Sequence, residues 1–122
     1  MLKKTVFLIA TLGVLGSLFS CPVFSSDEED TAALLEKGKA IAFDRKKGNC
    51  LACHHVEGGE LTGNYGPPLV AMKLRYPDRE VLRSQIWDAA VRNPNTRMPP
   101  FGRNRILTEE EIDLVTDYIQ SL

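Results

Sequence analysis

The stretch GNCLACHHVEGG, residues 48–59, places two cysteines and two histidines within six positions and has glycines on both sides. Thiols and imidazoles this close together can bind a metal ion, exchange electrons as a dithiol–disulfide pair, or hold a prosthetic group through covalent bonds. These three kinds of chemistry require different surroundings in the sequence, and the surroundings therefore distinguish them.

Cys50, Cys53 and His54 form the pattern C-x-x-C-H, which is the attachment motif of c-type haem. Two residues between the thiols let both sulfurs reach the two vinyl groups of one porphyrin, and the histidine then lies beneath the ring. A zinc site would need further Cys or His ligands at a distance, and the chain after residue 25 has none outside this stretch. A thioredoxin-like site would need a βαβ pattern, and a disulfide here would close a small, strained loop. We therefore predict one covalently attached haem c with its iron.

Three side chains are candidates for the second iron ligand: Met98, Met72 and His55. Met98 lies in NTRMPPF, residues 95–101, where prolines fix the backbone and lower the entropy lost when the thioether is held toward iron. Met72 lies in an apolar segment typical of core packing, and His55 is too close to the first ligand to reach the opposite face of the ring. We assign His54 and Met98 as the ligands. This pair fills both axial positions and raises the reduction potential, which favours electron transfer over reactions of a bound ligand.

The N-terminal segment has the pattern of a secretory signal peptide. Two lysines precede an uncharged apolar run over residues 5–19, and small residues follow. The run is shorter than the roughly 20 apolar residues that a membrane span needs. We place the signal peptide at residues 1–25 and one domain at residues 26–122, and we expect a periplasmic location. In the alternative, LFSC is a lipobox, and lipidation of Cys21 would anchor the protein to a membrane.

Helical periodicity predicts an all-α domain. Three main helices are expected over about residues 31–45, 78–92 and 108–122, with a short helical turn near residues 69–73. Thr108 and Glu111 form a capping box at the start of the last helix, and Leu107 can pack on Ile112 as a hydrophobic staple. The loops between the helices are rich in glycine and proline.

The composition, 25% charged and 43% hydrophobic, is ordinary for one small soluble domain. Without the two lysines of the signal peptide, 13 basic residues face 16 acidic ones, and the net charge of −3 argues against general nucleic-acid binding. The positive charges are concentrated near the methionine loop, at Arg97, Arg103 and Arg105. They form either a rim that docks an acidic partner or a solvated face that also balances haem propionates. Trp87 either donates to a propionate or packs in the core.

The haem motif, Met98 and the terminal helices together resemble the class I cytochrome c family. The resemblance implies three main helices around the haem, with the first and last helices crossing at a small residue. Gly38 facing Tyr118 matches that contact. It also implies that a proline carbonyl accepts the ring proton of the haem histidine, and in GPPL, residues 66–69, the expected acceptor is Pro67.

A narrower resemblance is to SoxX, the family of monohaem subunits of the SoxAX cytochromes of bacterial thiosulfate oxidation. It rests on GPPL and on two further segments, NPNTRMPPFG (residues 93–102) and ILTEEEI (residues 106–112), and it extends over most of residues 36–122. It implies a heterodimer with a SoxA-type haem subunit, which joins thiosulfate to a cysteine of a carrier protein. This chain would accept the released electrons and pass them to a soluble cytochrome c.

In that case the chain is the electron-transfer subunit of an L-cysteine S-thiosulfotransferase, and the catalytic residues lie on the partner. Two alternatives belong to other classes of function. One is a free-standing periplasmic electron-shuttle cytochrome, and the other is a catalytic haem protein with a labile distal ligand.

Overall fold

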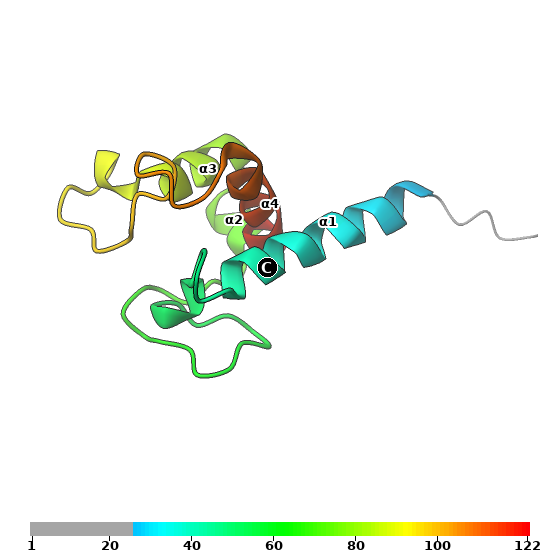
Figure 1. Ribbon diagram of the computed structural model, residues 1–122, viewed down its shortest axis with the longest axis horizontal. Coiled ribbons are helices and arrows are strands. Elements are labelled where there is room, and N and C mark those ends of the chain that lie inside the picture. The colour runs from blue at the N-terminus through cyan, green and yellow to red at the C-terminus, as the bar shows by residue number, and fades with distance from the viewer. Residues whose placement is uncertain (1–25) are drawn as a thin grey trace, which may run out of the picture.

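The computed structural model describes residues 26–122, and its regular structure is entirely helical (Figure 1). In chain order the elements are α1 (Ser26–Phe43), η1 (Cys50–Ala52), α2 (Met72–Arg75), α3 (Arg79–Trp87), η2 (Ala89–Val91) and α4 (Glu109–Gln120), where η marks a 3-10 helix. The described part of the chain contains no strand, which confirms the predicted all-α class. The predicted signal peptide and Cys21 lie outside the described residues.

Two of the predicted helices have different limits in the structure. α1 covers residues 26–43 rather than 31–45, and its acidic first turns, with Glu28, Glu29 and Asp30 exposed, suit the positive end of the helix dipole. The helix predicted over 78–92 is divided at Asp88, which has φ −156° and ψ 91°. Its carboxylate accepts a hydrogen bond from the Ala90 N–H at 3.0 Å, and this local bond replaces the continuation of α3.

α1 and α4 cross in close contact, as the resemblance to class I cytochromes c implied. A Cβ atom on Gly38 would lie 2.8 Å from the Tyr118 Cβ and would overlap the Leu114 carbonyl. Near this crossing the rings of Phe43 and Tyr118 meet edge to face, with centroids 6.1 Å apart. The absence of a side chain at Gly38 thus sets how closely the two helices approach.

The start of α4 is fixed by the predicted capping box. The Thr108 hydroxyl accepts from the Glu111 N–H at 3.1 Å, and the Glu111 carboxylate accepts from the Thr108 N–H at 3.1 Å. Leu107 and Ile112 are both buried in the core cluster, as expected for a staple. Lys47 also pairs with Glu111, which lowers the pKa of this carboxyl and links α4 to the turn after α1.

α3 is fastened to α4 by a group of ion pairs. Arg83 Nε donates to Asp113 Oδ1 at 2.8 Å, and Arg79 Nε donates to Asp117 Oδ1 at 2.5 Å. Arg83 also reaches Glu109 at 2.7 Å. These side chains are partly exposed, so each pair contributes little alone, but together they fix how α3 lies along α4.

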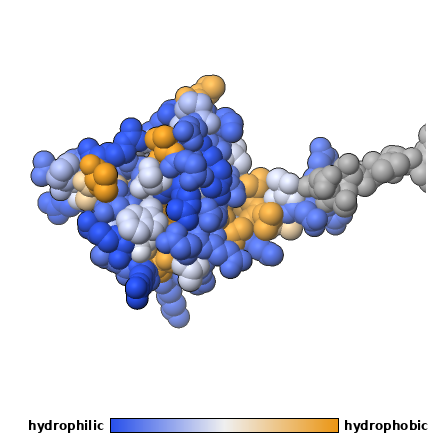
Figure 2. Space-filling model, turned by 90° about the horizontal axis from the view of Figure 1, so that it is seen from above, coloured by the Kyte–Doolittle hydropathy of each residue, from blue (hydrophilic) through white to orange (hydrophobic). Residues whose placement is uncertain are grey.

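The helices leave two long connections on one side of the molecule. Figure 1 shows the green connection between η1 and α2, and the yellow to orange connection between η2 and α4, away from the N-terminal end of α1. In Figure 2 the visible face is mostly hydrophilic, with a hydrophobic group on α1 where this helix leaves the body. None of the helices between residues 26 and 122 is long and apolar enough to cross a membrane.

Candidate haem site

The two long connections and the helices beneath them surround a cavity of about 680 Å³. This volume lies within the range of about 300–1,000 Å³ that is usual for cofactor sites. The five residues predicted for the site all line this cavity: Cys50, Cys53, His54, Pro67 and Met98. The fold therefore brings residues from distant parts of the sequence to one place.

The histidine lies on one side of the cavity and is held by the segment that follows it. The His54 Nδ1 is 2.7 Å from the Pro67 carbonyl oxygen, which accepts the ring proton. In that tautomer the other ring nitrogen, Nε2, keeps its lone pair for a metal. The Gly66 N–H donates to the Cys53 carbonyl at 2.8 Å and so keeps the proline segment beside the motif.

Two further residues support this histidine. Gly66 packs directly on the ring, because a Cβ atom there would lie 2.6 Å from the His54 Nδ1. Arg75 Nη1 donates to the Pro68 carbonyl at 2.8 Å and contacts the Met72 sulfur at 3.4 Å. Neither role was predicted from the sequence, since a glycine before two prolines reads as an ordinary turn and Arg75 as one of several basic residues.

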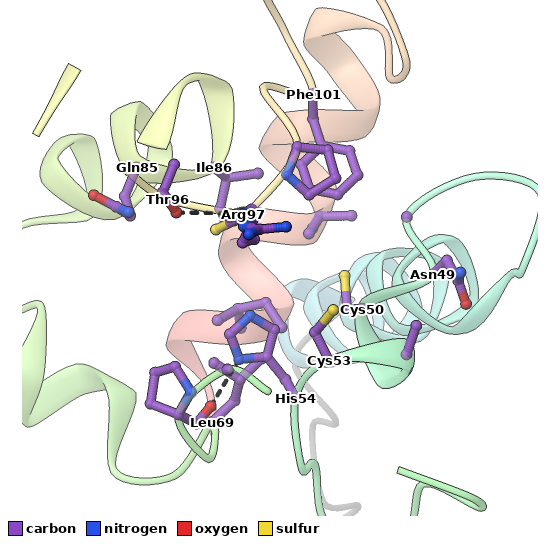
Figure 3. Close-up of a pocket in the computed structure, with 18 of the residues that line it drawn as sticks. Asn49, Cys50, Cys53, His54, Leu69, Gln85, Ile86, Thr96, Arg97 and Phe101 are labelled. Carbon is purple, nitrogen blue, oxygen red and sulfur yellow. Dashed lines mark hydrogen bonds between the residues drawn. The ribbon is translucent and has the colours of Figure 1, made fainter. Parts of the chain in front are cut away.

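The methionine side of the cavity is built from loop rather than helix. Met98 is half-buried, and its N–H donates to the Thr96 hydroxyl at 3.1 Å. In Figure 3, His54 lies on one side of an open space and Arg97 and Phe101 on the other. Cys50 and Cys53 carry their sulfurs at one end of that space. A flat ring bonded through the two sulfurs would thus lie between the histidine and the methionine loop.

The loop beyond Met98 is attached to α3 at two adjacent residues. The Gly102 N–H donates to the Trp87 carbonyl at 3.0 Å, and Gly102 lies against the indole so closely that a Cβ atom would overlap it. Arg103 Nη1 lies 2.9 Å from Asp88 Oδ2. The sequence placed Arg103 in a solvated or docking rim; in the structure its side chain is 54% exposed and is also paired with the buried carboxylate of Asp88.

Of the two roles considered for Trp87, donation to a propionate or packing in the core, the structure favours packing. Its indole N–H donates to the Glu109 carboxylate at 3.0 Å, which lowers the pKa of Glu109 together with the stronger contribution of Arg83. Since this donor already has a partner on α4, Trp87 serves the packing of α3, α4 and the methionine loop.

The residues of the cavity fit a covalently bound haem. Cys50 and Cys53 are both free thiols, and burial raises the pKa of the Cys50 thiol to about 11. The imidazole, the thioether and the apolar wall, which includes Leu69, Ile86 and Phe101, are the surroundings that a low-spin haem requires. Among residues 26–122 no three His, Cys, Asp or Glu side chains cluster as they would around a zinc ion.

The family model for cytochrome c matches residues 35–122, which include the C-x-x-C-H motif, Met98 and every helix after the first turns of α1. This chain belongs to the cytochrome c family. Its fold is that of a class I cytochrome c, and its cofactor is one covalently bound haem c with iron.

A similar curated protein is an uncharacterized lipoprotein of Aquifex aeolicus (strain VF5). The two are 30% identical over 95 residues, which are 74% of this chain and 46% of the relative. The chain therefore spans about half the length of the curated relative that it matches.

Proposed function

We propose that His54 and Met98 are the two axial ligands of the haem iron in this cytochrome and that Cys50 and Cys53 form the thioethers. The observation that carries the proposal is the arrangement of one cavity, in which the histidine and the methionine loop face each other and the thiols lie at the end. When bound, the haem supplies a metal centre that alternates between ferric and ferrous states.

The protein residues prepare the site for electron transfer and exclude other reactions. The Pro67 carbonyl fixes the ring orientation of His54 and makes the imidazole a stronger donor. Prolines around Met98 limit the conformations of the loop, so that little entropy is lost when its thioether is held in place. With His54 and Met98 both holding the iron, the haem would supply one-electron transfer and would offer no position for a substrate.

The charge around the cavity supports a negatively charged redox partner. All charged residues that line the cavity are basic: Arg45, Lys46, Lys47, Arg75 and Arg97. Lys47 is paired with Glu111, and Arg75 is bonded to the Pro68 carbonyl, whereas Arg97 forms no ion pair within the described part of the chain. A positive rim of this kind speeds association with an acidic protein and orients it toward the cofactor.

We further propose that the electron donor is the haem subunit of a thiosulfate-oxidising complex. The support is the resemblance to SoxX over most of residues 36–122, which is almost the same range as the family match. In this proposal a SoxA-type subunit conjugates thiosulfate to a carrier-protein cysteine as an L-cysteine S-thiosulfotransferase. This chain accepts the electrons and transfers them to a soluble cytochrome c.

The proposed location is outside the cytoplasm, in the periplasm. Haem is attached to bacterial c-type cytochromes in that compartment, and a relative described as a lipoprotein supports an exported protein. Anchoring through Cys21 is the alternative to a freely diffusing form.

The ligand assignment is tested by the reaction of the ferric protein with cyanide. We expect wild type to resist cyanide and Met98→Ala to bind it rapidly. Met72→Leu is the matched control, because Met72 is the other methionine lining the cavity and is 2% exposed. Wild type that binds cyanide as fast as Met98→Ala would instead indicate a catalytic haem protein with a labile distal ligand.

The role in thiosulfate oxidation is tested by purifying the protein from its native cells and following the optical spectrum of its haem. We expect a second haem subunit to co-purify, and thiosulfate to reduce this haem only when that subunit and the carrier protein are present. A monomer that purifies alone, and whose haem thiosulfate leaves oxidised under all these conditions, would favour the free-standing shuttle.

A further inference from the structure

We propose that Asp88 and Arg103 form a clasp that keeps the methionine loop closed, and that they are positioning residues for the Met98 ligand. We use "the clasp" for the pair of side chains Asp88 and Arg103. The inference rests on the proposed ligation by Met98, and it assigns to Arg103 a role other than docking or solvation.

The clasp is built around a carboxylate that has little contact with water. Asp88 is 3% exposed, yet both of its oxygens have partners: Oδ1 accepts from the Ala90 N–H at 3.0 Å, and Oδ2 lies 2.9 Å from Arg103 Nη1. A buried carboxylate stays charged only when it is paired and hydrogen-bonded, so leaving it without the guanidinium is costly. The guanidinium comes from the loop that carries Met98. The closed loop is therefore the arrangement that satisfies Asp88.

The segment between Met98 and Arg103 can transmit this constraint. It contains Pro99 and Pro100, which restrict the backbone, and Phe101, which is 6% exposed and anchored in the core. Gly102 is bonded to the Trp87 carbonyl, one residue before Asp88. A shift of the loop away from α3 would thus break the clasp and the Gly102 bond together and would carry Met98 with it.

On its other side Met98 has weaker support. Its backbone N–H donates to the Thr96 hydroxyl, a bond within the same loop, and Asn93, Asn95 and Arg97 nearby are exposed. Local opening of a protein begins where few buried contacts oppose it. The end of the loop at Arg103 is therefore the one whose attachment decides how often the thioether leaves the iron.

The test uses the ferric holoprotein, with cyanide as the probe of a vacant axial position. We compare wild type with Arg103→Gln and with Arg105→Gln. The latter is a matched control, because it removes the same charge from the same loop and Arg105 makes no side-chain ion pair among residues 26–122. Two readouts are recorded: the rate of cyanide binding and the thioether-to-iron charge-transfer absorption band.

We expect Arg103→Gln to bind cyanide at least tenfold faster than wild type and to show a weaker charge-transfer band. Tenfold corresponds to about 1.4 kcal/mol in the equilibrium of loop opening. Arg105→Gln should stay within about twofold of wild type, and Arg103→Lys should lie between Arg103→Gln and wild type. Arg105→Gln removes the same charge from the same loop, so an acceleration confined to Arg103→Gln is the result that loop opening predicts.

Asp88→Asn provides the same test if Arg103→Gln yields no folded holoprotein, because the amide has nearly the same shape and keeps an acceptor for the Ala90 N–H. If Arg103→Gln, Asp88→Asn and Arg105→Gln all bind cyanide at the rate of wild type, while Met98→Ala binds it faster, the clasp is overturned and the proposed ligation stands. If wild type reacts as fast as Met98→Ala, the proposed ligation fails and the clasp with it.

Discussion

The histidine side of the cavity, residues 50–69, and the methionine side, residues 93–105, are held in place by different kinds of contact. On the histidine side the ring of His54 is fixed by bonds within that same segment, such as His54 to Pro67 and Gly66 to Cys53. On the methionine side short-range bonds such as that from Met98 to Thr96 are joined by two contacts to the end of α3, made by Gly102 and Arg103. The first side is organised by its own chain, and the second depends on the helix beside it.

This difference has a consequence for stability. In the proposed arrangement the histidine side also carries the covalent attachment of the haem through Cys50 and Cys53, which remains when a hydrogen bond breaks. The methionine side is held by a hydrogen bond, an ion pair and apolar packing, each of which opens reversibly. We therefore expect damage to the histidine side to affect folding, and damage to the methionine side to affect mainly the ligation of the iron.

The largest contrast is expected between Cys50→Ser with Cys53→Ser and Met98→Ala. Loss of the haem leaves a cavity of about 680 Å³ that opens to solvent, so that its apolar wall faces water. The total stability of a small domain is only about 5–15 kcal/mol, so a loss of apolar contacts on this scale is expected to prevent folding. The double variant should show little helical circular dichroism and rapid proteolysis, whereas Met98→Ala should stay folded. Ala52→Ser, inside the same motif, is the control, and a well-folded haem-free double variant would contradict this view.

Gly38→Ala tests the helix crossing beneath both sides. On helix propensity alone, alanine should stabilise α1 by about 1 kcal/mol, but its Cβ would overlap the Leu114 carbonyl and crowd Tyr118. We expect a net loss of about 2–3 kcal/mol in the free energy of unfolding, measured by denaturant titration of the holoprotein.

The matched change in the opposite direction is Ala40→Gly, at an exposed position of α1, with an expected loss of about 1 kcal/mol. If Gly38→Ala proved as stable as wild type or more stable, the close contact of α1 and α4 would not control stability.

Gly66→Ala and Gly102→Ala form a symmetric pair, because each glycine packs against an aromatic ring on one side of the cavity. A methyl group at Gly66 would press on His54, and one at Gly102 would press on Trp87. We expect each variant to lose about 1–3 kcal/mol, with separate spectroscopic effects. Gly66→Ala should shift the hyperfine-shifted NMR resonances of the histidine, and Gly102→Ala should weaken the thioether charge-transfer band. Should both variants change both signals equally, the two sides would not be independent.

The smallest effect is expected from the ion pairs between α3 and α4, which support the methionine side indirectly. Arg83 holds the pKa of Asp113 below its ordinary value of 3.8. A carboxyl with a lowered folded pKa contributes stability that is complete above the unfolded pKa and is lost as the pH falls through the folded pKa. Arg83→Gln should therefore lower the thermal midpoint by roughly 2 °C or less at pH 7, because partly exposed pairs contribute little.

The difference between Arg83→Gln and wild type should shrink as the pH is lowered from about 5 to 3, since the unfolded chain then takes up a proton at Asp113 before folded wild type does. Differential scanning calorimetry over this range measures it. The control is Arg92→Gln. Arg92 follows η2 directly, is exposed, and forms no side-chain ion pair among residues 26–122. If the difference in thermal midpoint between Arg83→Gln and wild type stays constant down to pH 3, the pairing of Arg83 with Asp113 does not contribute to stability.

The features that could be predicted from the sequence are those whose partners are close along the chain. The capping box joins Thr108 and Glu111 within one helical turn, and the haem motif is contained in five consecutive residues. The break at Asp88 could not be predicted, although Asp88 and Ala90 are neighbours. An aspartate near the end of an apolar helical pattern has several possible partners, and Arg103 is supplied only by the folded loop.

The choice between two methionines shows the same limit. Both Met72 and Met98 line the cavity, so residence there does not distinguish them. Arg75 contacts the sulfur of Met72 at 3.4 Å. The backbone N–H of Met72 donates to the carbonyl of Leu122 at 2.8 Å, which ties Met72 to the segment just after α4. These contacts favour the core position proposed for Met72 and leave Met98, on the loop opposite His54, as the candidate ligand.

By itself the sequence determined the kind of cofactor, the all-α class and the start of the last helix, because each follows from the spacing of a few residues along one segment. Only the tertiary structure decided how the methionine loop is fastened, where α3 ends and which arginine is paired with a buried carboxylate. These features depend on groups that are far apart in the sequence and meet only after the helices have packed, so no local pattern specifies them.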